Sequence, residues 1–273
     1  MLIKDLSVYV DNDTQARARI EFAMELAERH GAHLTGVYAR RPIHSPVYIG
    51  TYLPADVVKQ LERVADAEEG EARALFDSVL AKSNLETHWR ASAEPSIRAL
   101  ALAGRNTDLL ILRPEPLHDP EARRDYDPGE VLLALGRPAL IAPCERGCKA
   151  PAKHAVIAWN GSRESARAVH DALPLLMISE RVSAVTFGEP TYGESPPPDI
   201  KEYLGRHGLK AEYQQLPDSE VETGEAVLAF ARQVEADLIV AGAYGRSRIR
   251  EIVLGGVTQY LLRHTTVPVL MSH

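Results

Sequence analysis

The sequence predicts an α/β fold with two Rossmann-like, doubly wound domains, each built on a parallel five-stranded sheet and paired within the chain as an intramolecular pseudo-dimer. Two observations carry this prediction. Short apolar segments alternate with amphipathic helical segments along the chain, and the same series of segments is present twice. The segments 109–112 (LLIL) and 238–241 (LIVA) are apolar throughout, which is typical of parallel strands that are covered on both faces.

The repeat can be followed segment by segment. In each half, a strand, a polar turn, an amphipathic helix and a second strand come first, and Asp11 of the first half falls opposite Asn160 of the second. A further helix and strand follow, and an apolar strand ends each half. The matching segments are 6–39 with 154–188, 94–112 with 223–241, and 137–143 with 267–273. One fold is therefore encoded twice.

The halves differ after the second strand. In the first half, a loop leads into a long helical pattern at about 55–82, whereas proline and glycine residues at 188–198 predict a loop in the second half. The polar stretch 145–153 joins the halves. We therefore expect a first domain at 1–146 and a second domain at 152–273.

Composition limits the class of protein. The chain has 273 residues, a formal net charge of -7 and 25% charged residues, which is ordinary usage for a globular protein. General nucleic-acid binding is not expected, because it needs a basic surface. No apolar run is long enough to span a bilayer, and the amino-terminal segment lacks the features of a signal peptide. We therefore expect a cytoplasmic protein that does not bind membranes.

A stretch rich in glycine and arginine at 242–256 follows the apolar strand 238–241. In an open parallel sheet, ligands bind beyond the carboxyl ends of the strands. Glycines allow a ligand to approach the backbone closely, and Gly255 and Gly256 precede a helical segment whose N-terminus would favour phosphate. The arginines add positive charge that suits phosphate oxygens. This stretch predicts a cradle for a polyphosphate.

The same stretch resembles the nucleotide signature of the universal stress proteins, Gly-x2-Gly-x9-Gly-[Ser/Thr]. Gly242, Gly245 and Gly255 match it in register, and both halves follow the family's order of strands and helices. The resemblance implies that the second half holds the ribose and phosphates of ATP or another adenine nucleotide. Gly256 departs from the pattern, because it lacks the hydroxyl group of Ser or Thr. One such hydrogen bond contributes about 0.5–1.5 kcal/mol, so we expect weaker binding rather than none.

The resemblance also implies contacts outside the glycine stretch. The turn AWNGS at 158–162 is expected to face the adenosine, with Asn160 where the family usually has Asp. Ser162 is also expected to cap the next helix, and Phe187 to contact the adenine. The predicted nucleotide contacts are Asn160, Gly161, Ser162, Phe187, Ala241, Gly242, Gly245, Arg246, Arg248, Gly255, Gly256, Val257 and Thr258.

The matching place in the first half lacks the signature. Arg113 stands opposite Gly242, and Pro116, which has no backbone donor, stands opposite Gly245. Gly129 is retained, but the residue after it is acidic. The acidic residues expected where phosphate would lie are Glu115, Asp119, Glu121, Asp125 and Asp127. We therefore expect a nucleotide only in the second half.

These features favour a stress-response regulatory protein that binds an adenine nucleotide and acts through protein partners, with a homodimer of tandem chains left open. An interaction scaffold without nucleotide is the main alternative. A slow ATPase ranks lower, because the sequence contains no known catalytic motif. A metal or redox module at Cys144 and Cys148, with His154, is a further alternative. The loose spacing of these residues and the scattered histidines lead us to expect no metal site.

Overall fold

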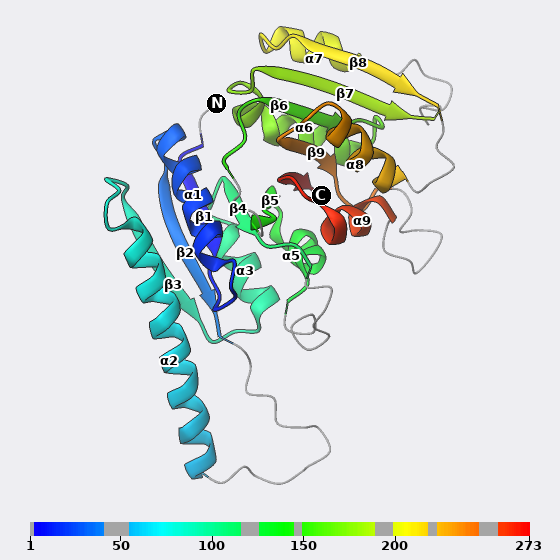
Figure 1. Ribbon diagram of the computed structural model, residues 1–273. Helices are drawn as coiled ribbons and strands as arrows, with labels where there is room; N and C mark the ends of the chain where they lie inside the picture. Colours follow the sequence, from blue (N-terminus) through cyan, green and yellow to red (C-terminus); the bar gives the residue numbers. More distant parts are fainter. Residues whose placement is uncertain are drawn as a thin grey trace.

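The structure is a computed structural model that describes residues 3–40, 55–115, 126–144, 149–188, 199–217, 223–245 and 256–273. The described strands form one ten-stranded sheet, which helices cover on both faces (Figure 1). The predicted α/β fold class is confirmed.

The two halves of the chain repeat one order of elements. The first half contains β1 (Asp5–Tyr9), α1 (Ala16–His30), β2 (His33–Ala39), α2 (Ala55–Leu80), β3 (Thr87–Ser92), α3 (Ser96–Gly104), β4 (Leu109–Leu112), α5 (Pro128–Leu135) and β5 (Ala139–Ile141). The second half contains β6 (His154–Ala158), α6 (Arg163–Leu176), β7 (Arg181–Phe187), α7 (Ile200–Arg206), β8 (Ala211–Leu216), α8 (Thr223–Gln233), β9 (Leu238–Gly242), α9 (Gly256–His264) and β10 (Val269–Ser272). The long helix predicted in the first half is confirmed as α2.

The halves meet at their last strands, and we call the pairing of β5 with β10 the seam. The strand order is β3-β2-β1-β4-β5-β10-β9-β6-β7-β8. At the seam the strands run antiparallel, with Leu140 opposite Leu270, whereas every other pairing among the described strands is parallel. The predicted pseudo-dimer therefore has its two five-stranded sheets joined edge to edge. This arrangement covers two short apolar strands that would otherwise be exposed sheet edges.

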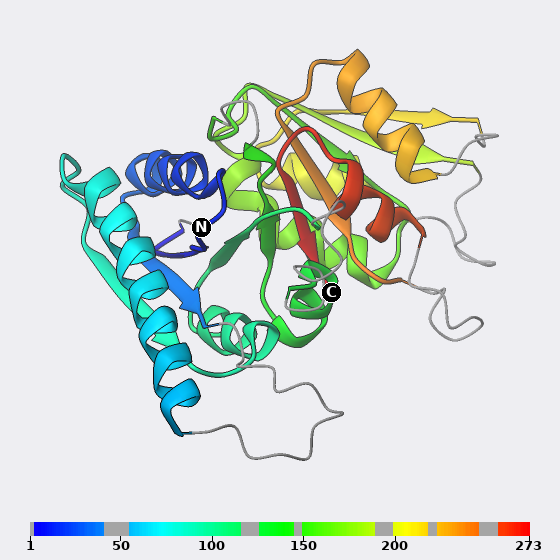
Figure 2. The same cartoon turned by 60° about the horizontal axis from the view of Figure 1, so that its bottom comes forward.

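Two apolar layers fill the space between the sheet and its helices. Helices α1, α2, α6 and α7 cover one face, and α3, α5, α8 and α9 cover the other (Figure 2). Successive strand residues alternate between the layers, as the pleat of a strand requires. In β4, Leu109 and Ile111 belong to the first layer, and Leu110 and Leu112 belong to the second. The continuous apolar runs in the sequence are explained by this burial on both faces.

The helices lie at the surface and are amphipathic. The longest described helix, α2, extends past the end of the sheet (Figure 1). Val57, Leu61 and Val64 are exposed on its first turns. None of the described helices combines the length and apolar character that crossing a membrane requires.

Leu140→Ala should lower the free energy of unfolding by about 2–5 kcal/mol, because it leaves a cavity at the seam where Leu140 is fully buried. Equilibrium unfolding in urea measures this change. Leu102→Ala is the matched control, since Leu102 is 43% exposed on α3, and it should change the free energy by less than about 0.5 kcal/mol. Equal losses in the two variants would contradict a stabilising role for the seam.

Candidate functional site

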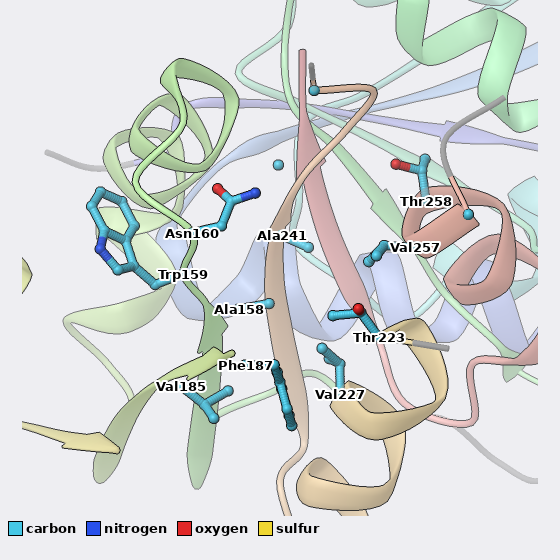
Figure 3. A pocket seen from close by; sticks show the side chains of 13 residues that line it. Ala158, Trp159, Asn160, Val185, Phe187, Thr223, Val227, Ala241, Val257 and Thr258 are labelled. Atoms are coloured by element: carbon cyan, nitrogen blue, oxygen red, sulfur yellow. The ribbon is translucent and has the colours of Figure 1, made fainter. Parts of the chain in front are cut away.

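A cavity of about 540 Å³ opens at the carboxyl ends of β6, β7 and β9. The first turns of α8 and α9 complete its wall (Figure 3). Its lining residues are Ala158, Trp159, Asn160, Val185, Phe187, Thr223, Val227, Ala241, Gly242, Gly245, Gly256, Val257 and Thr258. This is the sheet edge at which open parallel sheets bind ligands, and the volume suits a small organic molecule.

The cavity has an apolar end and a polar end. Val185 and Phe187 project from β7 and lie beside Val227 of α8, and together they form the apolar end (Figure 3). Asn160 and Thr258 lie toward the other end, where the glycine-rich backbone also lines the wall. A ligand with a flat apolar part and a polar or charged part fits this division.

A tight turn after β6 presents Asn160 to the cavity. Gly161 adopts a left-handed φ of +69°, and the Asn160 side-chain oxygen accepts a hydrogen bond from the Ser162 backbone N–H at 3.1 Å. Ser162 then caps α6, because its hydroxyl oxygen accepts from the Ser165 backbone N–H at 3.1 Å. The predicted helix cap is confirmed. Gly161 and Ser162 themselves do not line the cavity, so their role here is to shape the turn.

The structure brings together most, but not all, of the predicted contacts. Those that line the cavity are Asn160, Phe187, Ala241, Gly242, Gly245, Gly256, Val257 and Thr258. Arg246, Arg248 and Gly255 lie outside the described residues. The positive charge that the sequence places beside the glycines is therefore still a prediction.

Gly242 is required by packing rather than by conformational freedom. A Cβ atom at this position would lie 2.5 Å from the Ser165 backbone nitrogen and 2.6 Å from the Glu164 carbonyl carbon. The start of α6 thus packs directly against the end of β9, and a larger residue would push the two apart. Gly242 does not adopt a positive φ. The conformational freedom of glycine is therefore not the reason that this position needs a glycine.

Gly245 and Gly256 leave the cavity wall without side chains. Among the described residues, a Cβ atom at Gly245 would meet only the Glu164 carboxylate, at 3.6 Å, and one at Gly256 would meet no atom within 4 Å. Gly256 is the first residue of α9, so its N–H group is one of those that an α-helix leaves without a partner inside the helix. A ligand can therefore approach the backbone closely at both positions.

Among the described residues of this loop, Tyr244 adopts a left-handed conformation, with a φ of +54°. Its backbone N–H donates to the Thr258 hydroxyl oxygen at 3.1 Å, which ties the loop to the first turn of α9. The Tyr244 side chain is buried and reaches the other half, where a Cβ atom at Gly129 would lie 1.9 Å from its hydroxyl oxygen. Packing of this kind holds a backbone conformation that costs about 1–3 kcal/mol in other surroundings.

Glu164 brings a negative charge to the cradle. Its side chain is buried beside Gly242 and Gly245, and Arg163 donates a hydrogen bond to it. Burial alone raises the pKa of Glu164, but hydrogen bonds from Arg163 and from its own backbone N–H outweigh burial and hold this pKa below its ordinary value. Glu164 is therefore ionised at neutral pH and opposes a phosphate placed close to Gly245.

In the first half, the corresponding helix N-terminus is already occupied by a carboxylate. Asp127 caps α5, and its side-chain oxygen accepts from the backbone N–H groups of Gly129 at 2.7 Å and Glu130 at 3.3 Å. Glu115 pairs instead with Arg263 of α9, at 2.8 Å. The other residues of this region that the sequence singles out, Pro116, Asp119, Glu121 and Asp125, lie outside the described residues.

Charged and aromatic side chains fill the rest of the region of the first half that corresponds to the cavity. Arg19 is fully buried and binds Asp11, which also pairs with Arg113 at 3.0 Å. The Arg113 guanidinium lies over the ring of Tyr126 at 4.4 Å, and Tyr126 stacks on Tyr9 at 5.1 Å. Asp11, which matches Asn160 of the second half, is thus committed to an internal ion cluster. We call these five residues the Arg19 cluster.

Mutual pairing keeps the Arg19 cluster charged despite its burial. Burial raises the pKa of Asp11, but Arg19 and Arg113 outweigh it and hold this pKa below its ordinary value. Burial lowers the pKa of Arg19, and Asp11 and Asp13 reverse this effect so that the net shift is upward. Burial also raises the pKa values of Tyr9 and Tyr126, which therefore stay neutral.

Of the three residues of the metal or redox alternative, Cys144 and His154 belong to the described part of the chain. Cys144 is buried, and Cys148 lies outside the described residues. Both ring nitrogens of His154 are engaged inside the protein, with Nδ1 3.0 Å from the Val234 carbonyl oxygen and Nε2 2.8 Å from the Ser183 hydroxyl. These contacts leave neither nitrogen for a metal.

The list of predicted contacts leaves out five residues of the cavity wall, of which the first two belong to the turn 158–162 that was expected to face the adenosine. They are Ala158, Trp159, Val185, Thr223 and Val227. The alternation of strand residues could have identified Val185, because it lies two positions before Phe187 and therefore on the same face. The first turn of α8 carried no such signal, because its approach to β7 depends on the tertiary fold. Trp159 is 6% exposed, and its ring points away from the other lining side chains (Figure 3).

Comparison with known proteins links the second half of the chain to a known family. The sequence model of the universal stress protein family matches residues 151–273. The chain is 37% identical to universal stress protein Slr1230 of Synechocystis sp. over 67 residues, which make up 24% of this chain and 22% of that protein. The matched part therefore spans about a fifth of that relative.

Solved structures share the fold over nearly the whole chain. A universal stress protein from Archaeoglobus fulgidus matches with a TM-score of 0.73 and 13% identity, over 98% of this chain and 96% of that chain. Protein PA1789 from Pseudomonas aeruginosa matches with a TM-score of 0.55 and 13% identity, over 99% of this chain and 92% of that chain. The first half, which the family's sequence model does not match, is therefore similar to these proteins in fold.

Asp11→Asn should lower the free energy of unfolding by about 3 kcal/mol near neutral pH, because it leaves Arg19 buried with an incomplete set of partners. The lowered pKa of Asp11 makes its contribution present above the ordinary carboxyl range, and this contribution is lost as the pH falls through the lowered value. The difference between the two proteins should therefore shrink in acid. Urea unfolding at about pH 7 and about pH 3 measures both effects.

Asp77→Asn provides the control for this experiment, since the side chain of Asp77 is 63% exposed on α2. Its effect on the free energy of unfolding should stay below about 1 kcal/mol. A loss as small as this in Asp11→Asn would mean that the Arg19 cluster does not stabilise the first half.

Proposed function

We propose that this chain, whose residues 151–273 belong to the universal stress protein family, is a stress-response regulatory protein that binds one adenine nucleotide in the cavity of its second half. The observation that carries the proposal is the division of that cavity. An apolar slot between β7 and α8 faces a wall of bare backbone at the start of α9.

Each part of a nucleotide has a suitable place in this cavity. The flat adenine ring fits the slot formed by Val185, Phe187 and Val227, where burial of its faces is favourable. Asn160 lies toward the polar end and offers polar atoms to the ribose. The phosphates then lie against Gly245 and the first turn of α9, where backbone N–H groups and the helix dipole favour an anion.

We propose one nucleotide per chain because the first half satisfies the same groups internally. The Asp127 carboxylate occupies the N-terminus of α5, and the Arg19 cluster fills the space beside it. A nucleotide would have to displace a buried ion pair to enter, and this displacement would cost more than the contacts it could form.

Two features reduce affinity for phosphate in the second half. Gly256 offers no hydroxyl group, and the ionised Glu164 lies beside Gly245. The protein would thus hold its nucleotide more weakly than a member of the family with a full signature. An interaction scaffold without nucleotide is the second candidate function, and these two features favour it. Hydrolysis of ATP remains a lower-ranked alternative.

The division of the chain is part of the proposal. We infer a first domain at 1–146 and a second at 152–273, supported by the repeated order of elements on either side of the seam. Signalling through protein partners, and pairing of two tandem chains as a homodimer, extend the proposal and rest on the resemblance to the family.

Gly245→Val should weaken binding of ATP, ADP and AMP by at least about tenfold, because a branched side chain would stand between the ligand and the backbone. The variant should fold, since a Cβ atom at Gly245 has room. Isothermal titration calorimetry measures affinity and the number of sites, which should be one per chain.

Gly70→Val serves as the matched control, because Gly70 lies in α2 with no atom within 4 Å of a Cβ atom there. It should bind nucleotide like the natural chain. Unchanged affinity in Gly245→Val would place the nucleotide elsewhere, and two equivalent sites per chain would contradict a filled first half. Absence of binding by the natural chain would favour the scaffold.

Gly256→Ser should tighten ATP about two- to tenfold, because the added hydroxyl group contributes about 0.5–1.5 kcal/mol through a hydrogen bond to a phosphate oxygen. AMP has no β or γ phosphate and should gain little. Calorimetric titration of both nucleotides into both proteins separates this contact from a general stabilisation of α9. Equal gains for ATP and AMP, or no gain for either, would contradict the placement of the phosphates at Gly256.

A further inference from the structure

Two histidines from different strands meet at the edge of the first half. His33 begins β2, and His88 lies in β3, the outermost strand of the sheet on that side. The His33 Nε2 and His88 Nδ1 atoms are 2.5 Å apart, although the residues are 55 positions apart in the sequence. Glu86 lies beside them, and one ligand atom from each of the three residues falls within 4.8 Å of the others.

Strand register brings the three side chains to one face of the sheet. His88 pairs with Thr35 in the parallel ladder, and His33 and Thr35 are two residues apart, so both histidines lie on the same face. Glu86 precedes His88 by two residues and shares that face. His33 is partly exposed, and Glu86 and His88 are exposed, so an ion can reach the cluster from solvent.

The geometry and chemistry of the cluster suit Zn²⁺. Zinc binds histidine nitrogens at about 2.0–2.1 Å in tetrahedral geometry, which separates two such nitrogens by about 3.3 Å. The two rings would therefore move apart by about 0.8 Å to admit the ion, a shift that exposed side chains can make. Two histidines and one glutamate supply three ligands and leave a position for water.

A carboxylate behind His33 supports this arrangement. The Asp5 carboxylate oxygen lies 3.7 Å from His33 Nδ1, the nitrogen that faces away from His88. The negative charge of this carboxylate favours the tautomer of His33 that carries its proton on Nδ1, and in that tautomer the lone pair is on Nε2, the atom that faces His88. Metal-binding histidines are commonly oriented by carboxylates in this way.

The second half has no such cluster at the matching register. Arg181 stands opposite His154 as His33 stands opposite Asp5, and Glu212 takes the place of His88. An arginine does not coordinate metals, because it keeps its proton. The cluster is therefore a specific property of the first half and not a by-product of the repeated fold.

We propose that His33, Glu86 and His88 bind one Zn²⁺ ion that links the edge strand β3 to β2. The test is a competition titration of untagged protein with Zn²⁺ and a chromophoric chelator, together with the visible absorption of bound Co²⁺. His88→Ala should weaken Zn²⁺ binding roughly 100-fold, since loss of a ligand exceeds loss of an outer partner, which costs 10–100-fold. Asp5→Asn should weaken it about tenfold.

His207→Ala is the matched control, because His207 is exposed at the end of α7 and lies outside the cluster. It should bind Zn²⁺ like the natural chain. Circular dichroism checks that each variant is folded, and Zn²⁺ should raise the Tm of the natural chain but not that of His88→Ala. The proposal is overturned if His88→Ala or Glu86→Gln binds Zn²⁺ as tightly as the natural chain, or if His207→Ala loses binding equally.

Discussion

The antiparallel pairing of β5 with β10 determines how the two halves are oriented relative to each other. All other described pairings are parallel, so strand direction reverses at the seam, and the carboxyl ends of the two half-sheets lie at opposite edges of the whole sheet. Each half thus has its own carboxyl-terminal edge. Contacts across the seam, such as Arg263 with Glu115, hold the two halves together. One edge can therefore lose a ligand site while the other keeps it.

The two halves differ in how they provide negative charge to the N-terminus of the helix at this edge. A helix N-terminus directed at a cavity needs negative charge, which a ligand or a side chain can provide. In the first half Asp127 provides it from within the chain, and Arg19 and Arg113 balance the neighbouring Asp11. In the second half, the first residue of α9 is a glycine that borders an open cavity. The first site is filled by side chains of the chain itself, and the second site leaves room for a ligand.

The sequence predicts the elements well because their signals are local. Apolar runs, helical periodicity and the duplicated order led to the correct fold, and the Asn160–Ser162 turn was predicted down to its helix cap. Other features depend on contacts between distant segments. Gly242 is needed for the approach of α6, Tyr244 takes a left-handed conformation that neither Gly242 nor Gly245 takes, and the meeting of His33 with His88 requires the β2–β3 register. Local patterns carry no information about these contacts.

Tyr244 connects the candidate ligand loop of one half to the packing of the other. Its backbone is hydrogen-bonded to α9, and its hydroxyl group occupies the space that a side chain at Gly129 would need. Protein interiors are close-packed, so this ring cannot shift without opening a void or moving α5. A ligand that displaced the backbone at position 244 would therefore move the Tyr244 ring against Gly129 and shift α5. Binding of a ligand in the cavity of the second half would then strain the packing of the first half through the ring of Tyr244.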